Sequence, residues 1–288
     1  MKVAIVTDSN SGISMKEQTD DLFVVPMPFI INGEEFFEEL TLSQEDFYKK
    51  LETNENISTS QPSPYLVTDI WEKALKDHDE IVYIPMSSGL SESCNTANHL
   101  AENYKNVYVV NNQRISVTQK ESVFEALKLA KQGWTANEIK KALEQTKSDS
   151  SIYITVATLK YLKRGGRVTP AGALLGTILN IKPILQIHGE KLDAYAKVLS
   201  FGQAKAKMIN AVKKDLETTF KEYYENGEMV LEIAHTNIPN EAEKFKQEVQ
   251  KAFPNLKISY VDPLSLSISC HIGPGSLAIA TTRIAKNY

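Results

Sequence analysis

The chain has 288 residues, of which 42% are hydrophobic and 24% are charged, as is typical of a globular protein with a buried core. Its 32 basic and 36 acidic residues give a formal net charge of −4, which argues against nucleic-acid binding because such binders carry an excess of basic residues. No run reaches the roughly 20 apolar residues that span a bilayer, and the apolar start at 3–6 is too short for a secretory signal. Cys94 and Cys270 lie far apart, which favours the cytoplasm and excludes a cysteine-rich zinc site.

In the N-terminal half, short apolar runs alternate with amphipathic segments. Strands are expected at 3–6, 81–84 and 107–110, and helices at 43–51, 65–76, from residue 91 to about 104, 122–131 and 135–145. This alternation predicts a parallel sheet with helices on its faces.

The C-terminal half begins after the polar stretch 146–151, so we expect two α/β domains, at 1–150 and 151–288. Strands are expected at 152–156, 184–187, 191–198, 230–234 and 257–261, with a final strand before residue 282, and helices at 158–163, 169–179, 204–224 and 240–252. The strands on either side of His188 predict a hairpin.

Serine-rich turns follow two of the predicted strands, at 7–11 and at 87–91. Ligands of open α/β sheets bind beyond the carboxyl ends of the strands. The second turn leads into a helix, whose backbone N–H groups and positive end suit a carboxylate or a phosphate. Ser91 is read equally as the N-cap of that helix.

Three further segments contain polar groups and turn-forming residues. Residues 59–63 read Thr-Ser-Gln-Pro-Ser, which also describes a capped helix start, and residues 164–167 read Arg-Gly-Gly-Arg, which also describes a solvated turn. His271 precedes a glycine-rich turn and is either an anion donor or a structural histidine. No Gly-x-Ser-x-Gly, Walker A or His-Glu-x-x-His motif is present, although a Ser91–His271 pair with an acid partner stays open.

Taken in order, these motifs resemble those of the DegV family, which includes the fatty-acid-binding subunits of bacterial fatty acid kinase. The resemblance spans nearly the whole chain and rests on residues 6–9, 59–63, 87–91, 159–167, 179–185 and 271–275. It implies a Rossmann-like N-terminal α/β domain and a second α/β domain, with one long-chain fatty acid buried between them.

The resemblance also implies the roles of individual residues. Thr59 and Ser91 would hold the carboxyl group, and Arg167 and His271 would lie at the same end of the ligand. Ser60 and Ser88 are the neighbouring candidates in the same two motifs. An apolar helix at 171–179 is a candidate to line the tail or an ordinary core helix. The resemblance predicts no metal, no cofactor and no catalysis by this chain, because the ATP-dependent kinase partner makes the acyl phosphate.

One segment departs from the family pattern. Residues 197–204 read Lys-Val-Leu-Ser-Phe-Gly-Gln-Ala and lack the arginine that the family uses in phosphoryl transfer, for which Lys205 or Lys207 is the available substitute. Two alternatives therefore stay open beside the kinase carrier. One is a serine esterase or thioesterase that uses Ser91 and His271, and the other is a lipid-sensing regulator whose partner is not a kinase.

Overall fold

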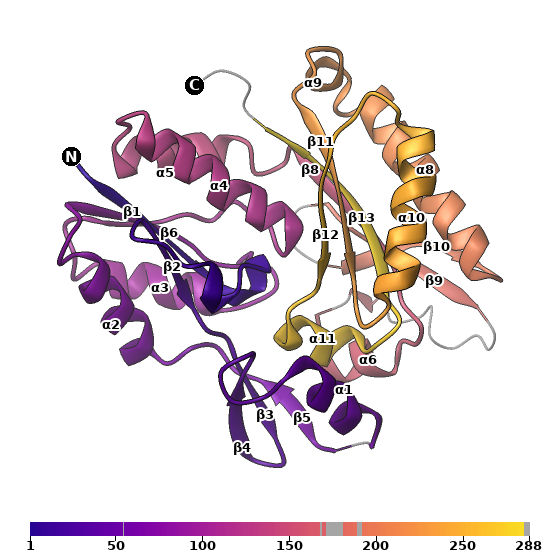
Figure 1. Ribbon diagram of the computed structural model, residues 1–288, viewed down its shortest axis with the longest axis horizontal. Coiled ribbons are helices and arrows are strands. Elements are labelled where there is room, and N and C mark those ends of the chain that lie inside the picture. The colour runs from indigo at the N-terminus through magenta and orange to yellow at the C-terminus, as the bar shows by residue number, and fades with distance from the viewer. Residues whose placement is uncertain (54, 168, 171–180, 189–191, 285–288) are drawn as a thin grey trace. The chain divides into compact units, whose positions relative to one another are not determined.

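The computed structural model describes residues 1–284 except 54, 168, 171–180 and 189–191 (Figure 1). Its contacts divide the chain into two compact units. Unit 1 comprises Met1–Ser148 together with Ser265–Ser267, and unit 2 comprises Asp149–Leu264 and the residues from Ile268 onward. Each unit has a sheet and a hydrophobic core of its own.

Unit 1 is built on a four-stranded parallel sheet with the order β2-β1-β6-β7. The predicted parallel sheet is confirmed, although its edge strand β2 was not predicted from the sequence. The strands are β1 (Val3–Asp8), β2 (Leu22–Val25), β6 (Glu80–Ile84) and β7 (Val107–Val109). Thr7 lies opposite Ile84, so the carboxyl ends of the two central strands meet.

Helices cover both faces of this sheet (Figure 1). They are α2 (Pro64–Ala74), α3 (Ser93–Ala101), α4 (Val117–Lys131) and α5 (Ala136–Gln145). Another helix of unit 1, α1 (Gln44–Glu52), packs against the small sheet described below. Alternate residues of β1 point to opposite faces: Val3 and Ile5 pack with α4 and α5, whereas Ala4 and Val6 pack with α2 and α3. The strands are buried on both faces, which explains why they read as continuous apolar runs.

A small antiparallel sheet, which the sequence analysis did not predict, follows β2. It has the order β4-β3-β5 and consists of β3 (Pro28–Ile31), β4 (Glu34–Phe37) and β5 (Ile57–Thr59). The ring of Phe29 packs edge-on against Phe47 of α1, with 5.3 Å between centroids. Short 3₁₀ turns, η1 (Ser9–Ser11) and η2 (Met15–Glu17), connect β1 to β2.

Unit 2 contains a six-stranded sheet with the order β10-β9-β8-β13-β11-β12. The strands are β8 (Ser150–Thr155), β9 (Lys182–Ile187), β10 (Leu192–Val198), β11 (Met229–His235), β12 (Ile258–Pro263) and β13 (Leu277–Arg283). The predicted hairpin is confirmed, because β9 and β10 pair antiparallel. Among the described strands of this sheet, only β11 and β12 pair parallel.

The helices of unit 2 are α6 (Lys160–Gly165), α8 (Phe201–Glu217), α9 (Lys221–Glu225), α10 (Pro239–Ala252) and α11 (Leu266–Ile272). The prediction of one helix over 204–224 is wrong, because α8 ends at Glu217. Thr218 leaves the helical conformation, with φ −124°, and Phe220 is buried in the core. The β-branched pair Thr218-Thr219 is a weak helix former at that point. The tail-lining candidates at 171–179 lie outside the described residues.

None of the described helices is long and apolar enough to cross a membrane.

Candidate functional site

A buried carboxylate, Asp8, lies where the carboxyl ends of β1 and β6 meet. It accepts hydrogen bonds from the backbone N–H of Met86 at 2.7 Å, from the backbone N–H of Asn10 at 3.0 Å and from Nε2 of Gln119 at 3.2 Å. Burial raises the pKa of Asp8 to about 6, against the opposing effect of these donors. The bond to Met86 anchors the start of the serine-rich turn 87–91.

The turn at 87–91 is closed by its own backbone. The N–H groups of Leu90 and Ser91 donate to the carbonyl of Ser87 at 3.0 and 3.1 Å, and the N–H of Gly89 donates to the Ser87 hydroxyl at 3.2 Å. The backbone N–H groups of Gly89, Leu90 and Ser91 are therefore already bonded within the turn.

Two hydroxyl groups of the turn have their protons available. The Ser91 hydroxyl accepts from the N–H of Ser93 at 3.2 Å, and the Ser88 hydroxyl accepts from the Asn111 amide at 2.8 Å. No described residue of unit 1 accepts a proton from either hydroxyl, and a hydroxyl with one lone pair occupied still has its O–H to donate. Helix α3 begins at Ser93 with Glu92 in the cap position, so Ser91, which the sequence offered as the N-cap, lies one residue before it.

The segment 59–63 lies beside helix α3 in unit 1. Thr59 is the last residue of β5, opposite Phe29, and is half-buried, whereas Ser60 is exposed. The hydroxyl of Thr96 on α3 donates to Oε1 of Gln61 at 3.0 Å. This contact brings the Thr59 segment close to the helix that follows Ser91.

The capped helix start predicted at 59–63 is confirmed as well. Ser63 is the N-cap of α2, and its hydroxyl accepts from the N–H of Leu66 at 3.2 Å. The capping role therefore falls on Ser63, while Thr59 and Ser60 precede the helix.

The two candidates of unit 2 interact with each other. Arg167 is exposed and follows Gly166, which ends α6 in the left-handed conformation with φ +66°. Burial, together with the positive charge of Arg167, lowers the pKa of His271 to about 4. At neutral pH the imidazole is therefore uncharged and retains one N–H donor, next to a permanently charged guanidinium.

The glycine turn after His271 is held in place by residues that the sequence analysis missed. The hydroxyl of Thr236 donates to the carbonyl of Gly273 at 2.7 Å and accepts from the N–H of Ser276 at 2.8 Å. Gly273 has φ +73°, and a Cβ built on it would lie 2.2 Å from the ring of Tyr161 on α6. Only the glycine itself signals this contact in the sequence, because Thr236 and Tyr161 are distant along the chain.

Lys205, a candidate substitute for the arginine of the family pattern, lies on α8 and is ion-paired. Its ammonium group contacts Glu241 at 2.9 Å and Glu248 at 2.6 Å, so its charge is matched by two carboxylates of α10. Lys207 is exposed.

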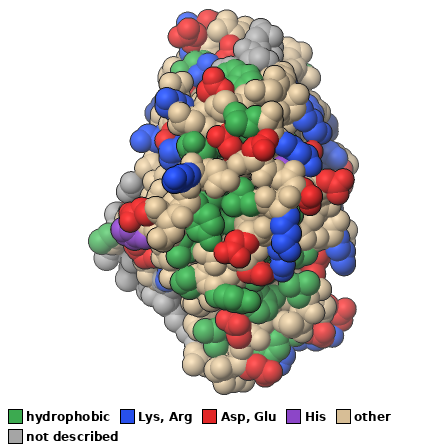
Figure 2. Space-filling model, turned by 90° about the vertical axis from the view of Figure 1, so that its left-hand side faces the viewer, with side chains coloured by type: hydrophobic (Ala, Val, Ile, Leu, Met, Phe, Trp, Pro, Cys, Tyr) green, Lys and Arg blue, Asp and Glu red, His purple; other side chains and the backbone are tan. Residues whose placement is uncertain are grey.

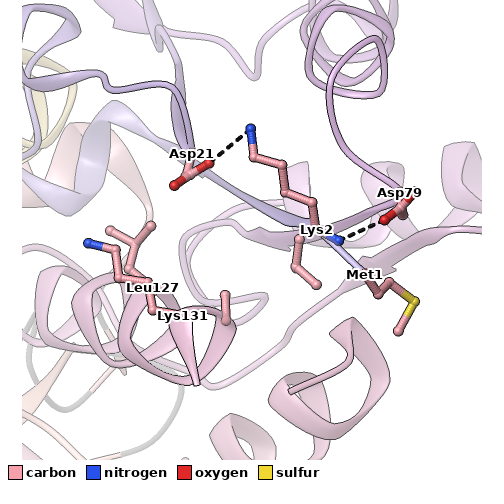
Figure 3. Close-up of a pocket in the computed structure, with 8 residues that line it drawn as sticks. Met1, Lys2, Asp21, Asp79, Leu127 and Lys131 are labelled. Carbon is pink, nitrogen blue, oxygen red and sulfur yellow. Dashed lines mark hydrogen bonds and ion pairs between the residues drawn. The ribbon is translucent and has the colours of Figure 1, made fainter. Parts of the chain in front are cut away.

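A surface pocket lies at the opposite, amino end of β1. It has a volume of about 350 Å³ and is lined by Met1, Lys2, Val3, Asp21, Asp79, Leu127, Ala130 and Lys131. Lys2 lies between two carboxylates (Figure 3): its ammonium contacts Asp21 at 3.4 Å, and its backbone N–H donates to Asp79 at 2.7 Å. The pocket is therefore not part of the serine-rich turns, which follow the carboxyl ends of the strands.

The charge distribution gives no sign of a nucleic-acid surface on the face drawn in Figure 2, where acidic and basic side chains are interspersed. Within the described part of the chain, no group of three or more His, Cys, Asp or Glu side chains is arranged to hold a metal ion.

The chain is similar to known proteins over its whole length. The family model described as "Uncharacterised protein, DegV family" matches residues 2–283. A DegV domain-containing protein of Listeria innocua is 32% identical, with 96% of this chain and 97% of the relative covered.

Solved structures show the same two-domain α/β fold, as predicted. The crystal structure of DegV from Bacillus subtilis, described as a fatty acid binding protein, is 27% identical, with 98% of this chain and 99% of that chain covered and a TM-score of 0.84. A fatty acid binding DegV family protein from Streptococcus agalactiae is 25% identical, with 99% and 100% covered and a TM-score of 0.87. The family model spans nearly the whole chain, and we conclude that this protein belongs to the DegV family.

Proposed function

We propose that the protein binds one long-chain fatty acid and is a carrier rather than an enzyme. In this proposal Thr59 and Ser91 hold the carboxyl group, Ser60 and Ser88 lie beside it, and Arg167 and His271 lie at the same end of the ligand. The carrier then presents the carboxyl group to an ATP-dependent kinase protein that forms the acyl phosphate.

The observation that carries the proposal is the pair of hydroxyl groups at Ser88 and Ser91. Each accepts a hydrogen bond from a protein N–H group, and no described residue of unit 1 accepts its proton. Donors without acceptors are what a carboxylate requires, because an ionised carboxylate only accepts hydrogen bonds. The similarity to fatty-acid-binding DegV proteins supports the same ligand class.

The affinity expected for a long-chain fatty acid comes mainly from burial of its acyl chain. Each buried CH₂ group contributes about 0.8 kcal/mol, so an acyl chain supplies most of the affinity. The head group then needs hydrogen bonds, because a buried carboxylate without partners is costly. Hydroxyl groups and one cation meet that requirement without the desolvation cost of a fully buried ion pair.

The first experiment identifies the ligand and tests the head-group residues. The protein is purified from its host and denatured, and the released molecule is identified by mass spectrometry; we expect one fatty acid per chain. The double variant Thr59→Ala plus Ser91→Ala should then weaken binding of oleate by about 1–3 kcal/mol, or roughly 5- to 150-fold. Ser43→Ala is the matched control, because it removes a hydroxyl that caps α1.

Unchanged oleate affinity in the double variant would contradict the assignment of Thr59 and Ser91. A purified protein that is empty and that also fails to bind added oleate would contradict fatty-acid binding itself. Turnover of an acyl ester that disappears in Ser91→Ala would instead identify an esterase.

The kinase step has its own test. The oleate-loaded protein is mixed with ATP and a purified fatty acid kinase subunit, and acyl phosphate is trapped with hydroxylamine. We expect oleoyl hydroxamate only when all three components are present. The absence of hydroxamate from a loaded protein would contradict the kinase step and favour a partner other than a kinase.

A further inference from the structure

Thr236, which follows β11, binds the glycine turn after α11 with all of its polar groups. Its backbone N–H donates to the carbonyl of Ser276 at 3.0 Å, and its carbonyl accepts from the N–H of Gly275 at 2.8 Å. Its hydroxyl donates to the carbonyl of Gly273 at 2.7 Å and accepts from the N–H of Ser276 at 2.8 Å. Thr236 and Ser276 are both fully buried, so bulk water does not replace these bonds when one of them is lost.

The same turn fixes the end of α11, the helix that carries His271. The N–H of Gly273 donates to the carbonyl of Ser269 at 2.8 Å, and Gly273 then leaves the helix with φ +73°. Its carbonyl is bound by Thr236, and a Cβ built on it would lie 2.2 Å from the ring of Tyr161. The backbone two residues after His271 is therefore held by α11 itself, by the residue that follows β11 and by α6.

His271 depends on such positioning because its imidazole is neutral. Burial, together with the positive charge of Arg167, lowers the pKa of His271 to about 4, so at neutral pH the ring offers an N–H group rather than a charge. A neutral hydrogen bond weakens steeply when the angle at the donor departs from linearity, whereas the attraction of a full charge depends on distance. The contribution of a neutral imidazole to binding is therefore set by the orientation of its ring.

We propose that Thr236 is a positioning residue that orients His271 toward the head group of the ligand. The inference rests on the fatty-acid binding proposed above and adds a residue that acts through the glycine turn, because the Thr236 hydroxyl gives its proton to Gly273. Threonine suits the position because one hydroxyl can donate to a backbone carbonyl and accept from a backbone N–H. Valine has the same shape but leaves both backbone groups without that partner.

The test measures oleate binding to the delipidated full-length protein by calorimetry. Thr236→Val should weaken oleate binding about fivefold or more, whereas Thr236→Ser, which keeps the hydroxyl, should change it by less than about twofold. Thr281→Val is the matched control, because it removes a buried hydroxyl that donates to the carbonyl of Val230 at 2.9 Å, away from the glycine turn. Thr236→Ala repeats the loss of the hydroxyl with a smaller side chain, and circular dichroism checks that each variant is folded.

A double-mutant cycle with His271→Ala separates positioning from a general structural role. If Thr236 acts through His271, Thr236→Val weakens oleate binding in the presence of the imidazole and has little further effect in His271→Ala. The same loss in both backgrounds, or unchanged oleate affinity in Thr236→Val and Thr236→Ala, would overturn the inference while fatty-acid binding stands. Failure of the wild-type protein to bind oleate would remove the proposed function itself.

Discussion

At the residue scale, Asp8 connects the sheet of unit 1 to the serine-rich turn. Its carboxylate is buried and accepts the N–H of Met86, so the turn depends on a group whose ionised form is disfavoured by burial. The pKa of Asp8 is raised from 3.8 to about 6. The folded state therefore binds more protons than the unfolded state between these two values.

The sign of the resulting pH dependence follows from linkage. The contribution of Asp8 to stability is fully present below about pH 4 and is lost as the pH rises through 6. Between about pH 4 and 6 the titration of Asp8 should lower the free energy of unfolding by about 3 kcal/mol, and we expect Asp8→Asn to remove this decrease. The free energy of unfolding, measured with urea at several pH values, checks this for wild type and variant. Asp20→Asn is the control, because Asp20 is exposed. Parallel pH profiles for wild type and Asp8→Asn would contradict the prediction.

The pH dependence of stability that His271 contributes has the opposite sign to that of Asp8. Its pKa is lowered from 6.5 to about 4, so its contribution to stability is present above pH 6.5 and is lost as the pH falls toward 4. The same low pKa keeps the imidazole neutral at pH 7. Arg167 therefore carries the positive charge of this pair, and His271 contributes a neutral donor.

At the element scale, the turn after α11 depends on close packing against α6. Gly273 has φ +73°, and a Cβ at this position would lie within 2.3 Å of two ring atoms of Tyr161. The turn is held in this conformation by Thr236, which binds the Gly273 carbonyl and the Ser276 N–H. A side chain at this position would therefore have to displace the ring of Tyr161.

We expect Gly273→Ala to destabilise the protein by more than about 3 kcal/mol, since backbone strain and a steric clash act together. Gly12→Ala is the matched control: Gly12 has φ +77° and nothing within 4 Å of the built Cβ. That variant should lower the free energy of unfolding by only about 1–2 kcal/mol, which is the strain of an alanine at positive φ. Urea unfolding of both variants gives the comparison, and equal losses would show that Tyr161 yields to the new methyl group.

At the scale of the whole molecule, the two units have separate cores and both tryptophans belong to unit 1. Trp71 is buried in α2, and Trp134 packs against the core that includes α4 and α5. Tryptophan fluorescence therefore reports on unit 1, whereas far-ultraviolet circular dichroism reports on both units. The lowered pKa values of His271 and His235 make unit 2 less stable as the pH falls below 6.5.

Acidification from pH 7 to 5 should therefore separate the urea unfolding transitions that fluorescence and circular dichroism report. The fluorescence midpoint in urea is expected to rise, because the raised pKa of Asp8 stabilises the folded form of unit 1 as the pH falls through 6. Part of the dichroism signal is expected to be lost at a lower urea concentration, because unit 2 is weakened. Asp8→Asn should remove the rise in the fluorescence midpoint. Coincident transitions by both probes at every pH would show that the units unfold as one cooperative body.

The sequence by itself determined the features that depend on near neighbours. The helix starts at Ser43, Ser63 and Thr135 follow from side-chain caps that bond within three residues. The parallel sheet of unit 1 follows from apolar runs that alternate with amphipathic segments, and the ordered motifs indicated the family.

Only the tertiary structure decided the features that join distant segments. The small sheet β4-β3-β5 was not predicted because its strands pair across the sequence, as Phe29 does with Thr59 about thirty residues away. The predicted helix 204–224 is interrupted where Phe220 enters the core. The Asn111–Ser88 contact and the raised pKa of Asp8 depend on neighbouring strands and on burial. Spacing along the chain indicates which groups are available, but their protonation and donor roles are set by the partners and the dielectric environment that folding supplies.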